Sequence, residues 1–145
     1  DLMTRKDKKT VLVIDGQGGK LGRQIITSIR ESLDQVHIIA VGTNAMATSN
    51  MIKAKVDIAV TGENAVIHNC KIADIIVGPI GIVIADSLHG EITPAMAQAV
   101  GQSMASRVLI PINKCNSMIV GINGISLTKL IESAIETIRH LIDEA

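Results

Sequence analysis

Residues 13–23 read Val-Ile-Asp-Gly-Gln-Gly-Gly-Lys-Leu-Gly-Arg, so an apolar run stops at four glycines within seven residues. An amphipathic segment follows, which predicts a strand, a tight loop and then a helix. Glycine lets backbone N–H groups approach a phosphate closely, and the N-terminus of a helix adds partial positive charge at the same place. The stretch therefore predicts a nucleotide-binding loop made by Gly16, Gln17, Gly18, Gly19, Lys20, Leu21 and Gly22.

The glycine spacing departs from two well-known phosphate-binding loops. The dinucleotide fingerprint has glycines at relative positions one, three and six, and Leu21 stands at the sixth position. Positions one, four and seven are glycines, and the last of these, Gly22, would let helix and strand pack closely. An NTPase loop needs glycine at position 14 and Ser or Thr at position 21, where this chain has Ile14 and Leu21. A structural turn without a ligand remains the alternative.

Composition restricts the class of protein. The chain of 145 residues is 47% apolar and has no Phe, Trp or Tyr, so aliphatic side chains and Met must fill its core. Continuous aliphatic runs are typical of a parallel sheet that is covered on both faces. The longest run, residues 75–85, is interrupted by glycine and proline and is shorter than the roughly 20 residues of a membrane span. Cys70 and Cys115 lie too far apart for a metal or redox motif, and we expect a soluble cytoplasmic protein.

Charge is balanced over the whole chain but not along it. The first ten residues carry four basic and two acidic side chains, whereas the rest carries ten basic and twelve acidic ones. We therefore expect a flexible basic N-terminus at residues 1–9 and one domain at residues 10–145. Without aromatic side chains the protein cannot stack on bases in the way of single-strand binders, which argues against nucleic acid as a partner.

Strand and helix signals alternate along the domain. Strands are predicted at residues 11–15, 36–41, 57–61, 74–77, 108–112 and 118–120. Helices are predicted at residues 21–33, 44–55, 63–70 and 127–142, and one more begins at Thr93-Pro94; Thr93 and Ser126 are the expected N-caps. This alternation predicts an α/β fold, a single Rossmann-like doubly wound domain with a mostly parallel sheet of about six strands in the order 3-2-1-4-5-6. Ligands would bind at the carboxyl ends of the first and fourth strands.

Two resemblances accompany these patterns. Residues 16–24 resemble the cofactor loop of dihydrodipicolinate reductases, which has glycines at the same spacing, a basic residue at the place of Lys20 and an Arg after the last glycine. Over its whole length the chain is similar to a small family of uncharacterised bacterial Rossmann-like proteins, through residues 13–19, 78–82 and 110–113. The second resemblance implies the fold and transfers no chemistry.

The end of the second predicted strand bears on the choice of cofactor. Dinucleotide-binding folds place a carboxylate there for the adenosine ribose, but this chain has Gly42-Thr43-Asn44. Small polar residues tolerate a 2′-phosphate, yet the nearest basic residue is Lys53. NAD(P) and coenzyme A are therefore expected only as classes of ligand. Asp15 would repel a pyrophosphate, and we expect it to accept backbone N–H bonds within the loop instead. The further cofactor-binding candidates are Thr43, Asn44, Gly78 and Pro79.

Catalytic candidates fall in two loops at the same predicted edge of the sheet. His89 could act as an acid or base oriented by Asp86, because imidazole titrates near neutral pH. Lys114 beside Cys115 favours a thiolate. The plainer interpretation is that Asp86 and His89 are loop hydrogen-bonding groups and that Cys115 is a small core residue. No spacing typical of a metal site occurs, and the lack of Tyr excludes a tyrosine-lysine dehydrogenase pair.

Two classes of function follow from these observations. The first is a binding module or sensor that holds a nucleotide-like ligand. The second is a small oxidoreductase-like enzyme whose active site is completed at a homo-oligomer interface. A structural protein without a nucleotide ligand is a third alternative. A mean hydropathy of +0.37 and a net charge of zero predict self-association as a homodimer.

Overall fold

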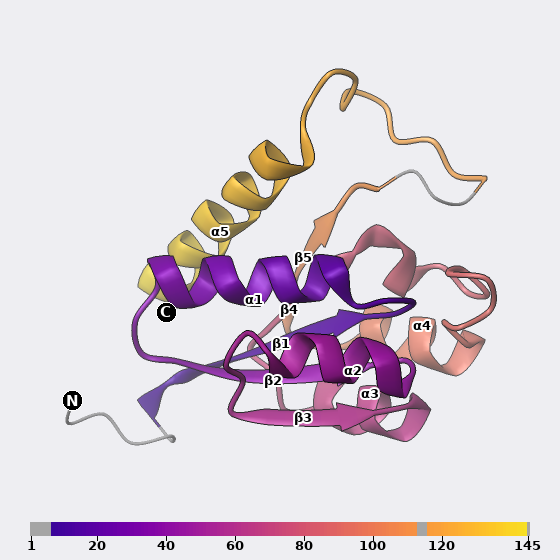
Figure 1. The fold of residues 1–145 in the computed structure, drawn as a ribbon, viewed down its shortest axis with the longest axis horizontal. Helices are drawn as coiled ribbons and strands as arrows, with labels where there is room; N and C mark the ends of the chain where they lie inside the picture. The colour runs from indigo at the N-terminus through magenta and orange to yellow at the C-terminus, as the bar shows by residue number, and fades with distance from the viewer. Residues whose placement is uncertain (1–6, 113–115, 145) are drawn as a thin grey trace.

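The computed structural model describes residues 7–112 and 116–144, which form an α/β fold around a five-stranded parallel sheet (Figure 1). The strands are β1 (Lys9–Asp15), β2 (Val36–Gly42), β3 (Ile58–Thr61), β4 (Ile75–Pro79) and β5 (Ser106–Ile110). The helices are α1 (Lys20–Ser32), α2 (Ala45–Ile52), α3 (Glu63–Cys70), η2 (Ile80–Val83), α4 (Pro94–Gln102) and α5 (Leu127–Asp143). The strand order is β3-β2-β1-β4-β5, which confirms the predicted reversal beside β1.

Both faces of the sheet are buried. In β1, Val11 and Val13 belong to one core cluster, and Leu12 and Ile14 belong to the other. Helices α1, α2 and α5 cover the first face, while α3 and α4 cover the second (Figure 1). The central strands are continuously aliphatic because helices cover both faces of the sheet. Every side chain of such a strand therefore meets a helix layer.

The helices begin where the sequence places their caps. Thr93 accepts a hydrogen bond from the backbone at the start of α4, and Pro94 takes the first helical position. Ser126 accepts a hydrogen bond from the backbone at the start of α5. Asn44 caps α2 with its side-chain oxygen. This helix ends at Ile52, three residues before the predicted end.

The predicted sixth strand at residues 118–120 is wrong. Residues 116–126, here called the arm, contain no helix or strand and extend away from the helices at the top of Figure 1. Only five residues, 113–117, would separate the predicted strand from position 112. A parallel partner for β5 needs a crossover of about a dozen residues or more, so this connection is too short for it. Met118 and Val120 are instead 90% and 97% exposed.

The described ends of the chain add two facts. Strand β1 begins at Lys9, and the flexibility expected for the residues before it stays a prediction. Within residues 7–112 and 116–144, no helix combines the length and the apolar character needed to cross a bilayer.

Two isoleucines on helices test the layered core. Ile26 of α1 is fully buried between helix and sheet, whereas Ile52 of α2 is 52% exposed. Ile26→Ala should lower the free energy of unfolding by about 2–5 kcal/mol, because it leaves a cavity. Ile52→Ala should change it by about 0.5 kcal/mol at most. Urea unfolding followed by far-ultraviolet circular dichroism measures both, and equal losses would contradict the assignment of the α1 layer.

Candidate functional site

The glycine loop joins β1 to α1 at the carboxyl edge of the sheet. Two of its residues adopt left-handed backbone conformations, Gln17 with φ 51° and Gly19 with φ 73°. Gly19 is the N-cap of α1 and provides no side chain to cap it, and its own N–H donates to the carbonyl of Gly16 at 3.0 Å. The loop therefore turns back on itself, and its N-cap residue gives no side-chain acceptor to the first N–H groups of α1.

Asp15 ties this loop to the end of β1. Its carboxylate is buried, and one oxygen accepts from the N–H of Gly16 at 2.8 Å while the other accepts from the N–H of Gly22 at 2.8 Å. The expectation that Asp15 serves the loop is thus confirmed. A carboxylate that receives two backbone N–H bonds at a helix N-terminus is well stabilised.

Three other N–H groups of the loop remain available. No described group accepts a hydrogen bond from the N–H of Gly18, Lys20 or Leu21. All three residues line a cavity of about 260 Å³. The remaining lining residues are Asp15, Gly16, Gln17, Gly19, Pro79, Gly81, Leu88 and Ile112. The cavity therefore combines unbonded backbone donors on one side with apolar side chains of β4 and the loops beyond it on the other.

The three later glycines of the loop have different roles. A Cβ on Gly22 would lie 2.9 Å from the Cβ of Asp15 at the end of β1, which confirms the expected close packing of helix and strand, and 2.5 Å from the sulfur of Met51 in α2. A Cβ on Gly19 would lie 2.5 Å from the carbonyl oxygen of Ala47 in α2, so this glycine also serves packing. A Cβ on Gly18 would meet nothing within 4 Å. Of these three glycines, Gly18 therefore has a Cβ position that is open among the described atoms.

The candidates on neighbouring strands divide between two places. Pro79, at the end of β4, lines the cavity. Gly78 does not line the cavity. A Cβ on Gly78 would collide with the carbonyl oxygen of Ile14, so this glycine allows β4 and β1 to approach closely. Thr43 and Asn44 lie on the other side of the glycine loop, after β2, and both are hydrogen-bonded to Glu91.

Glu91 is a site residue that the sequence interpretation missed. Its Oε1 accepts from the hydroxyl of Thr43 at 2.6 Å, from the side-chain amide of Asn44 at 2.7 Å and from the N–H of Gln17 at 2.9 Å. The chain thus brings a carboxylate to the end of β2 from the loop that follows β4. The absence of an acidic residue directly after the second strand indicated that an acid from elsewhere in the chain could occupy this place. Nothing in the sequence identified that acid as Glu91.

The hydrogen bonds of Glu91 change its titration. Burial raises the pKa of the Glu91 carboxyl, but the bonds from Thr43, Gln17 and Asn44, together with the nearby charge of His89, outweigh this effect. The net result is a pKa below the usual value. The carboxylate is therefore ionised at neutral pH.

The proposed acid-base pair after β4 does not come together. Asp86 and His89 are exposed, neither lines the cavity, and no hydrogen bond or ion pair between them occurs in the described structure. Instead the loop has an unusual backbone, with φ of 65° at Asp86, 54° at Leu88 and 56° at His89. Ser87 donates to the carbonyl of Gly81 and anchors the turn. Lys114 and Cys115 lie outside the described residues, and in the part that is described no cluster of His, Cys, Asp or Glu could hold a metal ion.

The comparisons with known proteins add a family and a distant structural likeness. The family model described as "Domain of unknown function (DUF3842)" matches residues 10–143, so the chain belongs to that family. This agrees with the resemblance to uncharacterised proteins, while the likeness of the loop to dihydrodipicolinate reductases stays a prediction. No curated protein matches the chain. The crystal structure of a dodecameric FMN-dependent Ubix-like decarboxylase from Escherichia coli O157:H7 is similar over 94% of this chain and 93% of its own, with 16% identity and a TM-score of 0.47.

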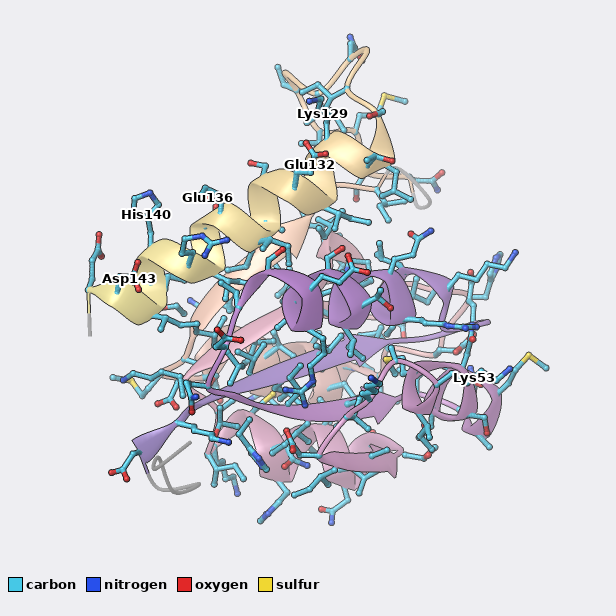
Figure 2. All side chains as sticks on the ribbon, turned by 60° about the vertical axis from the view of Figure 1, so that its left-hand side comes forward. Lys53, Lys129, Glu132, Glu136, His140 and Asp143 are labelled. Atoms are coloured by element: carbon cyan, nitrogen blue, oxygen red, sulfur yellow. The ribbon has the colours of Figure 1, made fainter. Side chains whose placement is uncertain are left out.

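The bonds of Glu91 predict a pH dependence of stability. Because its pKa is lower in the folded than in the unfolded chain, Glu91 stabilises the fold above the unfolded pKa of about 4.5 and loses this effect as the pH falls. Glu91→Gln should therefore lose stability at pH 7 and converge with the parent protein in acid. Urea midpoints between neutral and acidic pH measure this, and Glu132→Gln, on the exposed face of α5 (Figure 2), is the control. A difference from the parent that stays constant with pH would contradict the assignment.

Proposed function

We propose that this member of the DUF3842 family binds a phosphorylated, nucleotide-like ligand at the N-terminus of α1 and acts as a binding module or sensor. The observation that carries the proposal is the set of N–H groups of Gly18, Lys20 and Leu21, which line the cavity and have no described acceptor. Unsatisfied donors in the first turn of a helix, together with the helix dipole, favour a phosphate.

The rest of the cavity suits the remainder of such a ligand. Lys20 is exposed at the cavity and adds a positive charge. Asp15 is already engaged by two N–H groups, which offsets its repulsion of an anion. Pro79, Leu88 and Ile112 provide apolar contact for a ring. These features support a nucleotide-like ligand over a bare phosphate ion.

A binding role is better supported than an enzymatic one. Asp86 and His89 are the catalytic candidates among the described residues. Both are exposed and neither lines the cavity, which gives no support to a catalytic role. The alternative of a small oxidoreductase-like enzyme would need a second subunit to complete the site and exclude water. The structural alternative, a turn without ligand, would leave the three N–H groups to water.

NADP has the weakest support among the expected ligands. Its 2′-phosphate would need a cation beside Thr43 and Asn44. Lys53, the nearest basic residue in the sequence, follows the last turn of α2, whereas Asn44 caps the first turn. The two residues therefore lie at opposite ends of the helix.

Gly18 gives a direct test, because an added methyl group would enter the ligand space without touching the protein. Gly18→Ala should weaken nucleotide binding at least about tenfold, since one lost or distorted charge-assisted hydrogen bond accounts for that factor. Thermal shift and calorimetry with AMP, nicotinamide mononucleotide, NAD, coenzyme A and FMN measure the binding. The lack of aromatic residues also makes ultraviolet absorbance of the purified protein a report of copurified nucleobase.

Gly101 provides the matched control. It also has an open Cβ position and no left-handed backbone, but it lies in α4, away from the cavity. Gly101→Ala should bind as the parent protein does. If no nucleotide copurifies and none of the five compounds stabilises the protein, the structural alternative replaces our proposal.

We also propose that the chain forms a homodimer and that the arm takes part in the contact. Met118, Val120 and Ile125 of the arm are 90%, 97% and 46% exposed. Monomers seldom expose such a concentration of large apolar side chains, and closed two-fold pairing is the commonest way to bury them. A second copy is thus the proposed occupant of this surface.

Light scattering tests the dimer. The parent protein at micromolar concentration should have about twice the chain mass of 15.3 kDa, and Met118→Ser with Val120→Ser should shift it to the monomer. Met104→Ser, at a fully exposed residue between α4 and β5, is the control and should leave the dimer intact. A parent protein that is only monomeric would overturn the proposal.

A further inference from the structure

We infer that the glycine loop accepts a phosphate monoester with a single ring system, as in a mononucleotide, and disfavours dinucleotides. This inference rests on the proposed function and names the class of ligand. Its basis is the position of Glu91, which closes the side of the loop at β2, while the cavity lies on the side of β4.

Glu91 occupies a hydrogen-bond donor of the glycine loop that the second phosphate of a dinucleotide would meet. In doubly wound folds a dinucleotide crosses the glycine loop and places its adenosine ribose at the end of β2. Here the Oε1 atom of Glu91 already bonds the N–H of Gln17, the hydroxyl of Thr43 and the amide of Asn44. A pyrophosphate that crosses the loop would have to displace the bond from the N–H of Gln17, and the ionised carboxylate would repel its second phosphate.

Glu91 is held in place by the core on both sides. Leu88 and Ile92, which flank it in the turn, are 8% and 1% exposed. The turn is closed by bonds from the N–H of Asp86 to the carbonyl of Ile92 at 2.7 Å and from the N–H of Ile92 to the carbonyl of Ser87 at 3.2 Å. These contacts fix the backbone that carries Glu91 at the end of β2. A rotation of the Glu91 side chain away from this place would break all three of its hydrogen bonds.

The open side of the loop has room for one ring system. The cavity of about 260 Å³ is lined by Pro79, Gly81, Leu88 and Ile112, none of which belongs to β2 or α2. Sites for drug-sized ligands occupy about 300–1,000 Å³. The cavity is slightly smaller than this range, so a mononucleotide with its phosphate at the start of α1 would fill it and a dinucleotide would extend beyond it.

Matched pairs of ligands test the inference on the parent protein. Nicotinamide mononucleotide and NAD share one half, and so do FMN and FAD. At least one mononucleotide should bind at least about tenfold more tightly than its dinucleotide, because the carboxylate and the lost bonds oppose only the second half. Calorimetry of all four compounds gives the ratios. Phosphate is the additional probe, and it should bind more weakly than the preferred mononucleotide.

Two variants separate charge from space. Glu91→Ala opens the end of β2 and should reduce the preference for the mononucleotide, whereas Glu132→Ala on α5 should preserve it. Glu91→Gln keeps the shape and should have an intermediate preference. Circular dichroism checks the fold of each variant, and the ratios of the parent protein decide the question even if Glu91→Ala does not fold.

The outcomes distinguish this inference from the proposed function. NAD or FAD binding as tightly as the matching mononucleotide would overturn the inference and leave the proposed function intact. No binding of these four compounds, of AMP or of coenzyme A, with no copurified nucleobase, would overturn both. An unchanged preference in a folded Glu91→Ala protein would show that Glu91 is not the cause and would also overturn the inference.

Discussion

The two hydrogen bonds to Asp15 are the constraint on which the site depends. They join the last residue of β1 to the start and the end of the glycine loop, through the N–H groups of Gly16 and Gly22. The buried carboxylate thus fixes both the axis of α1 and its distance from the sheet. Removal of one partner would leave a buried charge or two buried donors unsatisfied, which is among the costlier changes in a protein core.

The same bonds divide the loop into groups with different roles. Asp15 takes the donors at its two ends, and Glu91 takes Gln17. Gly18, Lys20 and Leu21 are left facing the cavity. This division explains how an acidic residue can stand at the end of β1 beside the proposed anion site: the dipoles of two N–H groups stabilise its charge, and the proposed ligand does not use those groups. The electrostatic character of the cavity is then set by the helix start and Lys20.

Much of the fold was predictable from sequence because each central strand is buried on both faces. Such burial forces long aliphatic runs, and the caps Thr93 and Ser126 mark the helix starts locally. The sixth strand was predicted wrongly because apolar residues at 118–120 resemble a strand, and only the length of the connection rules out parallel pairing. Glu91 was not predictable, since it meets Gln17 across 74 positions and through a turn that no local pattern indicates.

That turn has an energetic consequence. Asp86, Leu88 and His89 all hold left-handed backbones without being glycine, and each such residue costs about 1–2 kcal/mol. This strain lowers the stability of the turn below what its hydrogen bonds alone would give. Only the buried neighbours and hydrogen bonds of the turn keep these residues in such conformations. The hydrogen bonds of Glu91 thus offset part of this backbone strain.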